Sequence, residues 1–200
     1  LFGIFSALGF LSKYLFIYVL LTFFIFFIFN YKKYKKSLNK YFFSILISLA
    51  LLTPHFFWLF ENNFITIFYG LDRSGVPEFN YIDHLKNPIM FLIKQLIILI
   101  PFFLMIYTVI KKFKFSINTK NKETIYLLSI NLIPIALILA TSIVTGAKIR
   151  TMWMTPFYLF FGTLFISIFK NFIDTKKIKK FYYIFLFFFI LSPTLYLTIS

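Results

Sequence analysis

Long runs of apolar residues, separated by short polar segments, make up most of the chain. Phe, Ile and Leu dominate these runs without the strict alternation that is typical of barrel strands. Backbone groups in lipid must be hydrogen-bonded within their own segment, so runs of about 20 such residues predict membrane-spanning helices. The predicted spans cover residues 1–12, 14–30, 41–60, 88–110, 124–145, 152–169 and 181–200. The pattern therefore predicts an all-α, polytopic transmembrane helical bundle.

The first apolar run is short and begins with Leu1 rather than with a methionine. We therefore expect residues 1–12 to be the end of a longer or re-entrant helix. On this interpretation residues 1–200 are a transmembrane domain fragment of a larger protein.

The longest polar segment, residues 61–87, lies between two predicted spans. Gly70, Gly75 and Pro77 favour turns there, so we expect an irregular loop. This loop contains four of the six acidic residues of the chain, which are Glu61, Asp72, Glu78 and Asp83. We interpret these acids as solvated residues of a loop that covers a ligand-binding site.

Composition supports a membrane location and limits the chemistry. Hydrophobic residues make up 60% of the chain and charged residues 14%, with a mean hydropathy of +0.87, so too few polar groups are present to cover a soluble protein. The absence of cysteine excludes disulfides, thiolate metal sites and cysteine catalysis. The two histidines, His55 and His84, do not have the spacing with a carboxylate that zinc sites use. The sequence thus predicts no metal site and no cofactor, and leaves any metal requirement open.

Lysines divide the polar segments into two classes. Three alternate segments carry five lysines each: Lys32, Lys33, Lys35, Lys36 and Lys40; Lys111, Lys112, Lys114, Lys120 and Lys122; and Lys170, Lys176, Lys177, Lys179 and Lys180. The positive-inside rule places these segments in the cytoplasm and residues 61–87 outside. Because membrane topology explains the lysines, the net charge of +15 does not indicate nucleic-acid binding.

Several cations gather toward the predicted external face. Lys94 and Gln95 adjoin within an apolar helix, which favours a face turned to protein or to a water-filled cavity. Interfacial lysines also serve as membrane anchors, so both interpretations stay open for each cation. The candidates for binding a phosphate-bearing ligand are Lys13, Lys94, Lys148 and Arg150.

A second group of candidates follows Pro54, which loosens the helix at the end of the predicted span 41–60. His55, Trp58 and Asn62 share one helical face at i, i+3 and i+7. Trp58 also suits the aromatic belt of a membrane protein, and His55 suits an ordinary helix contact. The candidates for lining a pocket are His55, Trp58, Asn62, Gln95 and Trp153.

Four motifs follow one another along nearly the whole chain. They are Gly9-Phe10-Leu11-Ser12-Lys13-Tyr14; Pro54-His55-x2-Trp58 with Asn62-Asn63-Phe64 and Phe68; Asn87-Pro88 with Gln95; and Thr145-Gly146-x-Lys148-x-Arg150-x2-Trp153-x2-Pro156-x-Tyr158. In their order and spacing these motifs resemble those of bacterial membrane glycosyltransferases of family 39. That family includes relatives of the protein mannosyltransferases and of the aminoarabinose transferase that modifies lipid A.

This resemblance implies a GT-C fold in the bacterial inner membrane, with an active site at the external face. It implies a polyprenyl-phosphate-linked sugar as donor and a lipid, glycan or protein as acceptor. The catalytic carboxylate of that family lies in the first external loop, which would precede Leu1, so none of the present acids is assigned that role. The four candidate cations would stabilise the departing phosphate.

Proteins of other classes share the same pattern of spans and cations. A polysaccharide flippase, a polysaccharide polymerase or a transporter is the alternative function. A transporter would be expected to show charged or broken helices near the membrane midplane. An acidic pair soon after the first span of the whole protein would favour the transferase.

Overall fold

The computed structural model describes residues 1–75, 80–111 and 121–199. The described residues form helices joined by short connections and contain no β-strand, which confirms the predicted all-α bundle. The helices are α1 (Phe2–Ser12), α2 (Ile17–Phe29), α3 (Tyr31–Tyr34), α4 (Leu38–Glu61), α5 (Ile65–Arg73), α6 (Asp83–Val109), α7 (Lys122–Thr145), α8 (Phe161–Phe169) and α9 (Ile178–Ile199). Short 3-10 segments adjoin several of them, the longest being Thr151–Tyr158.

Four of these elements are long and apolar enough to cross a membrane: α4, α6, α7 and the stretch Thr175–Thr198 that includes α9. A fifth candidate span joins Thr151–Tyr158 to Phe161–Phe172 through a bend of 51°. The described residues are therefore those of a membrane protein with four or five candidate spans. The predicted spans 1–12 and 14–30 are helical, but α1 is only about 17 Å long at 1.5 Å per residue, too short to cross a bilayer alone.

The structure differs from the sequence prediction in residues 61–87, which are not an irregular loop throughout. Helix α5 fills Ile65–Arg73, and α6 begins at Asp83 rather than at Pro88. Pro88 removes a single backbone donor, which a long helix tolerates when neighbouring groups pack around it. Glu78 and Pro77 lie outside the described residues.

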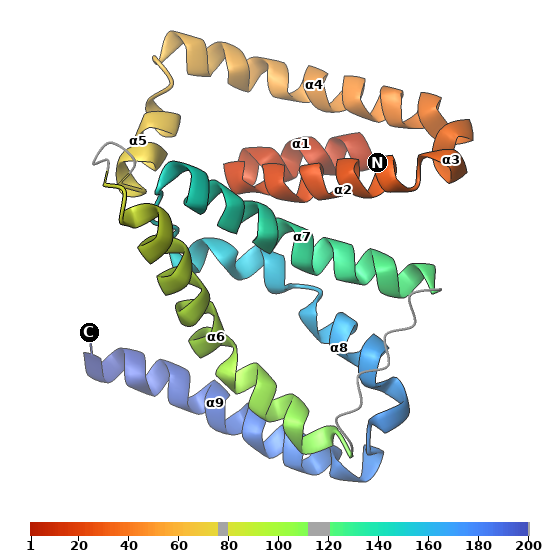
Figure 1. The fold of residues 1–200 in the computed structure, drawn as a ribbon, viewed down its shortest axis with the longest axis vertical. Coiled ribbons are helices and arrows are strands. Elements are labelled where there is room, and N and C mark those ends of the chain that lie inside the picture. Colours follow the sequence, from red (N-terminus) through yellow and green to blue (C-terminus); the bar gives the residue numbers. More distant parts are fainter. Residues whose placement is uncertain (76–79, 112–120, 200) are drawn as a thin grey trace.

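The helices form two packed groups that meet at the centre of the molecule (Figure 1). In the first group α1 lies against α4, and α2 connects this pair to α7. In the second group the first turns of α6 contact α7, and the last turns of α6 contact α9. Helix α8 packs against α7. The two groups are therefore held together mainly through α2 and α7.

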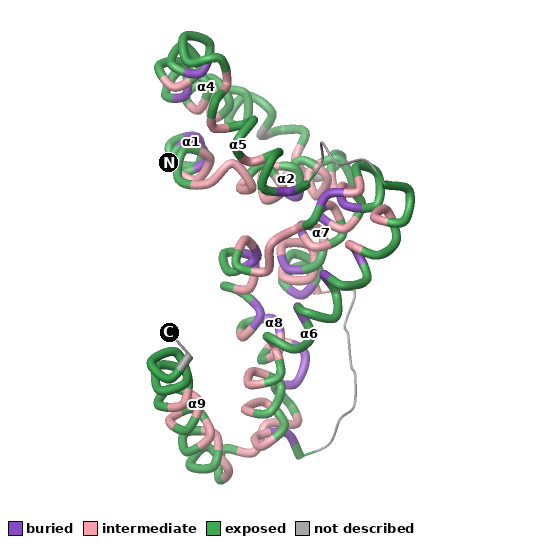
Figure 2. Tube along the Cα trace, turned by 90° about the vertical axis from the view of Figure 1, so that its left-hand side faces the viewer, coloured by how far each residue is buried: buried purple, intermediate pink, exposed green. Residues whose placement is uncertain are grey.

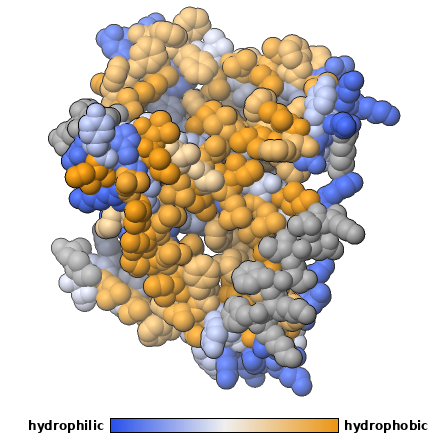
Figure 3. All heavy atoms as spheres, viewed as in Figure 1, coloured by the Kyte–Doolittle hydropathy of each residue, from blue (hydrophilic) through white to orange (hydrophobic). Residues whose placement is uncertain are grey.

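A small core lies where α2, α6, α7 and the segment Thr151–Tyr158 meet. Its buried side chains are Phe91, Ile138, Met154 and Phe157. Outside this core most side chains of the long helices are exposed, and none of the described side chains of α9 is buried (Figure 2). The exposed surface between the two ends of the bundle is apolar (Figure 3), as lipid contact requires.

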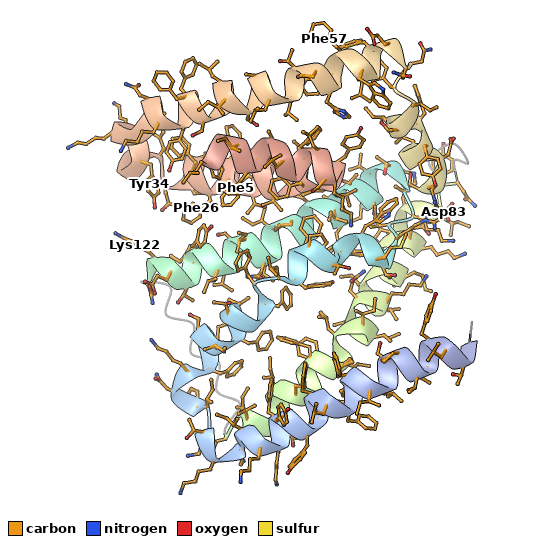
Figure 4. The ribbon with its side chains drawn as sticks, turned by 180° about the vertical axis from the view of Figure 1, so that it is seen from behind. Phe5, Phe26, Tyr34, Phe57, Asp83 and Lys122 are labelled. Carbon is orange, nitrogen blue, oxygen red and sulfur yellow. The ribbon has the colours of Figure 1, made fainter. Side chains whose placement is uncertain are left out.

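Polar connections gather at the two ends of the bundle. Tyr34 and Lys122 lie at one end and Asp83 lies at the other (Figure 4). The end with Lys122 also holds the connection before α9, where the Lys111 ammonium lies 3.8 Å from the Asp174 carboxylate. This end carries the basic segments, and we call the opposite one the α5 end.

The orientation of the bundle leads to a labelling prediction. Asn80 is exposed at the α5 end and Thr175 is exposed at the basic end, and the sequence contains no cysteine. If the basic end is cytoplasmic, an impermeant thiol reagent applied to intact cells should label Asn80→Cys and should label Thr175→Cys only after permeabilisation. The reverse labelling would invert the assignment of the two faces.

Candidate anion-binding site

A cavity of about 330 Å³ opens at the α5 end, between the end of α5, the first turns of α6 and the segment that follows α7. Its wall carries three lysines and one aspartate. We call it the cation cavity, and its lining residues are Ser74, Gly75, Asp83, Lys86, Asn87, Met90, Phe91, Lys94, Lys148 and Ile149.

One face of α6 supplies most of this wall. Asp83, Lys86, Asn87 and Lys94 follow at i, i+3, i+4 and i+11, a spacing that places them along one side of a helix. Phe91, on the same side, is 2% exposed and belongs to the core. Burial of this ring fixes the rotation of α6 and so holds the polar face toward the cavity.

The segment after α7 supplies the third lysine. Helix α7 ends at Thr145, and the next residue, Gly146, has a φ of +69°, the left-handed conformation that glycine adopts without strain. The Asn87 side-chain amide donates to the Gly146 carbonyl at 2.7 Å, and the Lys148 backbone N–H donates to the Ser74 carbonyl at 2.7 Å. These bonds join α5, α6 and the end of α7, and they bring Lys148 to the cavity.

Histidine 84 strengthens the same junction from the next position along α6. His84 Nδ1 donates to the Ile143 carbonyl of α7 at 2.7 Å. Hydrogen bonds between three separate elements thus hold the walls of the cavity together. None of these bonds uses the side-chain ammonium group of Lys86, Lys94 or Lys148.

The charges of the cavity favour an anion. Lys86, Lys94 and Lys148 are exposed, and Asp83 is half-buried. Within the described residues no ammonium group lies within the 4.0 Å of an ion pair with the Asp83 carboxylate. Three like charges around one small cavity repel one another, so a bound anion would lower their free energy. Ammonium groups bind phosphate as point charges, and the volume suits a head group.

The structure brings together two of the four predicted phosphate-binding cations, Lys94 and Lys148. Lys13 lies elsewhere, at the turn between α1 and α2, where its ammonium donates to the Trp153 carbonyl at 3.1 Å. Partial burial lowers the pKa of Lys13, since desolvation disfavours its charged form. Arg150 is half-buried and is not among the lining residues. The roles predicted for Lys13 and Arg150 remain predictions.

The predicted pocket residues near the end of α4 form a separate cluster. The Tyr14 hydroxyl lies 2.9 Å from His55 Nε2 and 2.8 Å from the Thr66 hydroxyl. The His55 ring stacks on Trp58, with ring centres 5.9 Å apart and planes 14° apart. The Asn62 side-chain amide donates to the Trp58 carbonyl at 2.8 Å. These residues therefore connect the short 3-10 segment before α2 with the end of α4 and with α5.

Gln95 and Trp153 also lie outside the cation cavity. Gln95 is 4% exposed, and its side-chain oxygen accepts a hydrogen bond from the Tyr158 hydroxyl at 2.5 Å. The Trp153 carbonyl accepts from Lys13. The Gln95 side chain therefore joins α6 to the segment Thr151–Tyr158, as expected of a polar group turned toward protein rather than lipid, whereas the contact of Trp153 is made by its backbone.

Asp83, Lys86 and Asn87 were not among the predicted binding residues, although Lys86 belongs to the cations of the predicted external face. The helical spacing that links all three to Lys94 is present in the sequence. That spacing becomes visible only if the helix begins before Pro88, whereas proline is normally a sign of a helix start.

In the described parts of the chain, no three histidine or acidic side chains lie close enough together to hold a metal ion. The polar side chains among the described lining residues are three ammonium groups, an amide, a hydroxyl and one carboxylate, those of Lys86, Lys94, Lys148, Asn87, Ser74 and Asp83. Comparison with protein-family models, with curated proteins and with solved structures found no match to the chain. The chemistry of the site is therefore inferred from its own geometry.

Proposed function

We propose that the chain belongs to a membrane glycosyltransferase whose cation cavity binds the phosphate of a polyprenyl-phosphate-linked sugar. The sugar is transferred to a lipid, glycan or protein acceptor at the external face of a bacterial inner membrane. The observation that carries this proposal is the meeting of Lys86, Lys94 and Lys148 around one cavity at the end opposite the basic segments. The motif resemblance to family 39 agrees with it.

The position of the cavity suits a ligand that is anchored in lipid. Its lysines lie in the first turns of α6, a candidate span, and in the segment that follows α7, another candidate span. Lysines near the end of a span extend toward the head-group layer, where the phosphate of a lipid-linked donor also lies. A polyprenyl phosphate therefore reaches this cavity from within the membrane plane.

The lysines also suit the chemistry of transfer. When the bond from the sugar to the phosphate breaks, the phosphate keeps the electron pair and gains negative charge. Ammonium groups fixed beside it bind this leaving group more strongly than the intact donor, which lowers the barrier. Asn87 and Gly146 contribute by holding the two sides of the cavity together.

The proposal is tested with the purified full-length protein, a membrane extract that supplies the acceptor, and a polyprenyl-phosphate-linked sugar radiolabelled in its polyprenyl phosphate, by measuring release of polyprenyl phosphate. Lys148→Gln removes one charge-assisted contact worth about 1.5 to 3 kcal/mol, so turnover should fall roughly tenfold to 150-fold. Lys94→Gln should have a similar effect. Lys32→Gln, in α3 at the basic end, is the matched control and should leave turnover unchanged.

Full turnover in both Lys148→Gln and Lys94→Gln would refute phosphate binding by this cavity during transfer. A wild-type protein that releases no polyprenyl phosphate, but moves a fluorescent lipid-linked sugar across a vesicle membrane, would instead be the alternative flippase or transporter.

A further inference from the structure

A carboxylate among three lysines needs an explanation beyond phosphate binding. Asp83 lines the cavity together with Lys86, Lys94 and Lys148, yet within the described residues its carboxylate forms no ion pair with any of them. Asp83 lies in the first turn of α6, where a carboxylate stabilises the helix, but a phosphate bound in the cavity would be repelled by this negative group on the same wall. The carboxylate therefore indicates a second group on the ligand.

The nature of that group follows from what a carboxylate can do. An ionised carboxylate only accepts hydrogen bonds, so the part of the ligand that faces Asp83 must donate them. The hydroxyl groups of a sugar are such donors, whereas an ionised phosphate and the hydrocarbon of a lipid are not. The three ammonium groups, by contrast, only donate and so suit the phosphate. The cavity thus offers complementary groups for both parts of a sugar phosphate.

The position of Asp83 in the fold favours selective recognition of a ligand. Asp83 begins α6, and its neighbour His84 is bonded to the Ile143 carbonyl of α7. A side chain placed on Gly146 would lie 3.7 Å from the Asp83 Cβ atom, so the segment after α7 passes directly beside this residue. The backbone and Cβ atom of Asp83 are therefore placed between two packed helices, and a residue whose backbone is fixed loses less freedom when it binds a ligand.

We infer that Asp83 determines the ligand class of the cation cavity, by accepting hydrogen bonds from the hydroxyl groups of a sugar whose phosphate is held by the lysines. This inference rests on the proposed function and adds a residue that selects sugar phosphates over other phosphates.

The test compares two soluble probes, inorganic phosphate and glucose 1-phosphate, bound to the full-length protein in detergent at pH 8 and measured by calorimetry. Asp83→Asn keeps the size of the side chain but removes its charge. Inorganic phosphate should bind more tightly to this variant because a repulsive charge is gone. The preference for glucose 1-phosphate over inorganic phosphate should fall about fivefold, which is the difference between a charged and a neutral acceptor.

Two further variants distinguish recognition of the sugar by Asp83 from a simple change in the net charge of the protein. Asp72→Asn removes an exposed carboxylate of α5 that does not line the cavity, and it should leave the preference unchanged. Asp83→Glu keeps the charge but moves it by one methylene group. It should keep inorganic phosphate weakly bound and should still lose the preference for the sugar phosphate. Asp83→Glu also supplies the answer if Asp83→Asn does not fold.

An unchanged preference in Asp83→Asn and Asp83→Glu would overturn the role of Asp83 while leaving phosphate binding by the lysines intact. A wild-type protein that binds neither probe would overturn both the inference and the proposed cavity. Normal binding of both probes together with full turnover in both Lys148→Gln and Lys94→Gln would contradict the proposed function alone. The failures of the two proposals are therefore distinguishable.

Discussion

Replacing Gly3 with valine is expected to separate α1 from α4 and to lower the free energy of unfolding by at least about 3 kcal/mol. A Cβ atom on Gly3 would lie 2.2 Å from the Ser44 carbonyl oxygen and 3.0 Å from its carbonyl carbon. Both atoms belong to the backbone of α4, so no change of side-chain rotamer relieves the overlap. The whole of α1 must move.

The loss should be large because close approach is what holds this helix pair. Ser6 and Ala7 are buried on the same side of α1 as Gly3, and small residues let helices in lipid pack through backbone contacts. Movement of α1 also pulls Tyr14 away from His55 and Thr66. Denaturant unfolding of the purified protein measures the effect.

Gly162→Val in α8 is the matched control for this change. A Cβ atom there meets nothing within 4 Å, so the same substitution adds bulk without overlap. Its midpoint of unfolding should stay close to that of the wild type. Equal midpoints for Gly3→Val and Gly162→Val would show that α1 does not depend on its contact with α4.

Replacing Gly146 with valine is expected to weaken phosphate binding by the cation cavity about tenfold or more and to destabilise the protein by about 2 kcal/mol. The φ of +69° at Gly146 is strained for any L residue and most for a β-branched one. A Cβ atom would also lie 3.3 Å from His84 Nε2. The segment after α7 should therefore shift and carry Lys148 away from Lys94.

A substitution at Gly75 separates the two causes of the expected loss of stability, which are backbone strain and the contact with His84. Gly75 has the same φ of +69°, but a Cβ atom there meets nothing within 4 Å. Gly75→Val should therefore cost only the backbone strain, about 1 to 2 kcal/mol, and the additional loss in Gly146→Val should report the contact with His84. Equal losses of stability in thermal unfolding would show that crowding at His84 has no effect.

The existence of the helices was predictable from the sequence, whereas their limits and partners were less so. Apolar runs require helices in lipid, and this physical constraint is strong enough to predict α4, α6 and α7 without further information. Helix α5 was not predicted because Gly70 and the polar residues around it are typical of turns. The long-range contact between α1 and α4 is not visible in either segment alone.

The site was predictable only in part for a similar reason. Lys94 stood out because it interrupts an apolar helix, and Lys148 because it lies in a short connection. Their meeting depends on the packing of α6 against α7 and on the bond from Asn87 to Gly146, which join residues far apart in the chain. Lys13 had the same sequence character, but the fold directs it to the Trp153 carbonyl instead.

Helix α9 has no buried residue in its apolar window and contacts the rest of the bundle chiefly through α6, with the Lys111–Asp174 ion pair at its beginning. Transfer of its side chains from water to lipid, rather than contact with other helices, therefore supplies most of the free energy that keeps it in place. Over evolutionary time such a segment is constrained by its hydropathy and length more than by the identity of its residues. Its sequence should drift among Phe, Ile and Leu much faster than that of α7, where Asn131, Ile138 and Ser142 are fully enclosed.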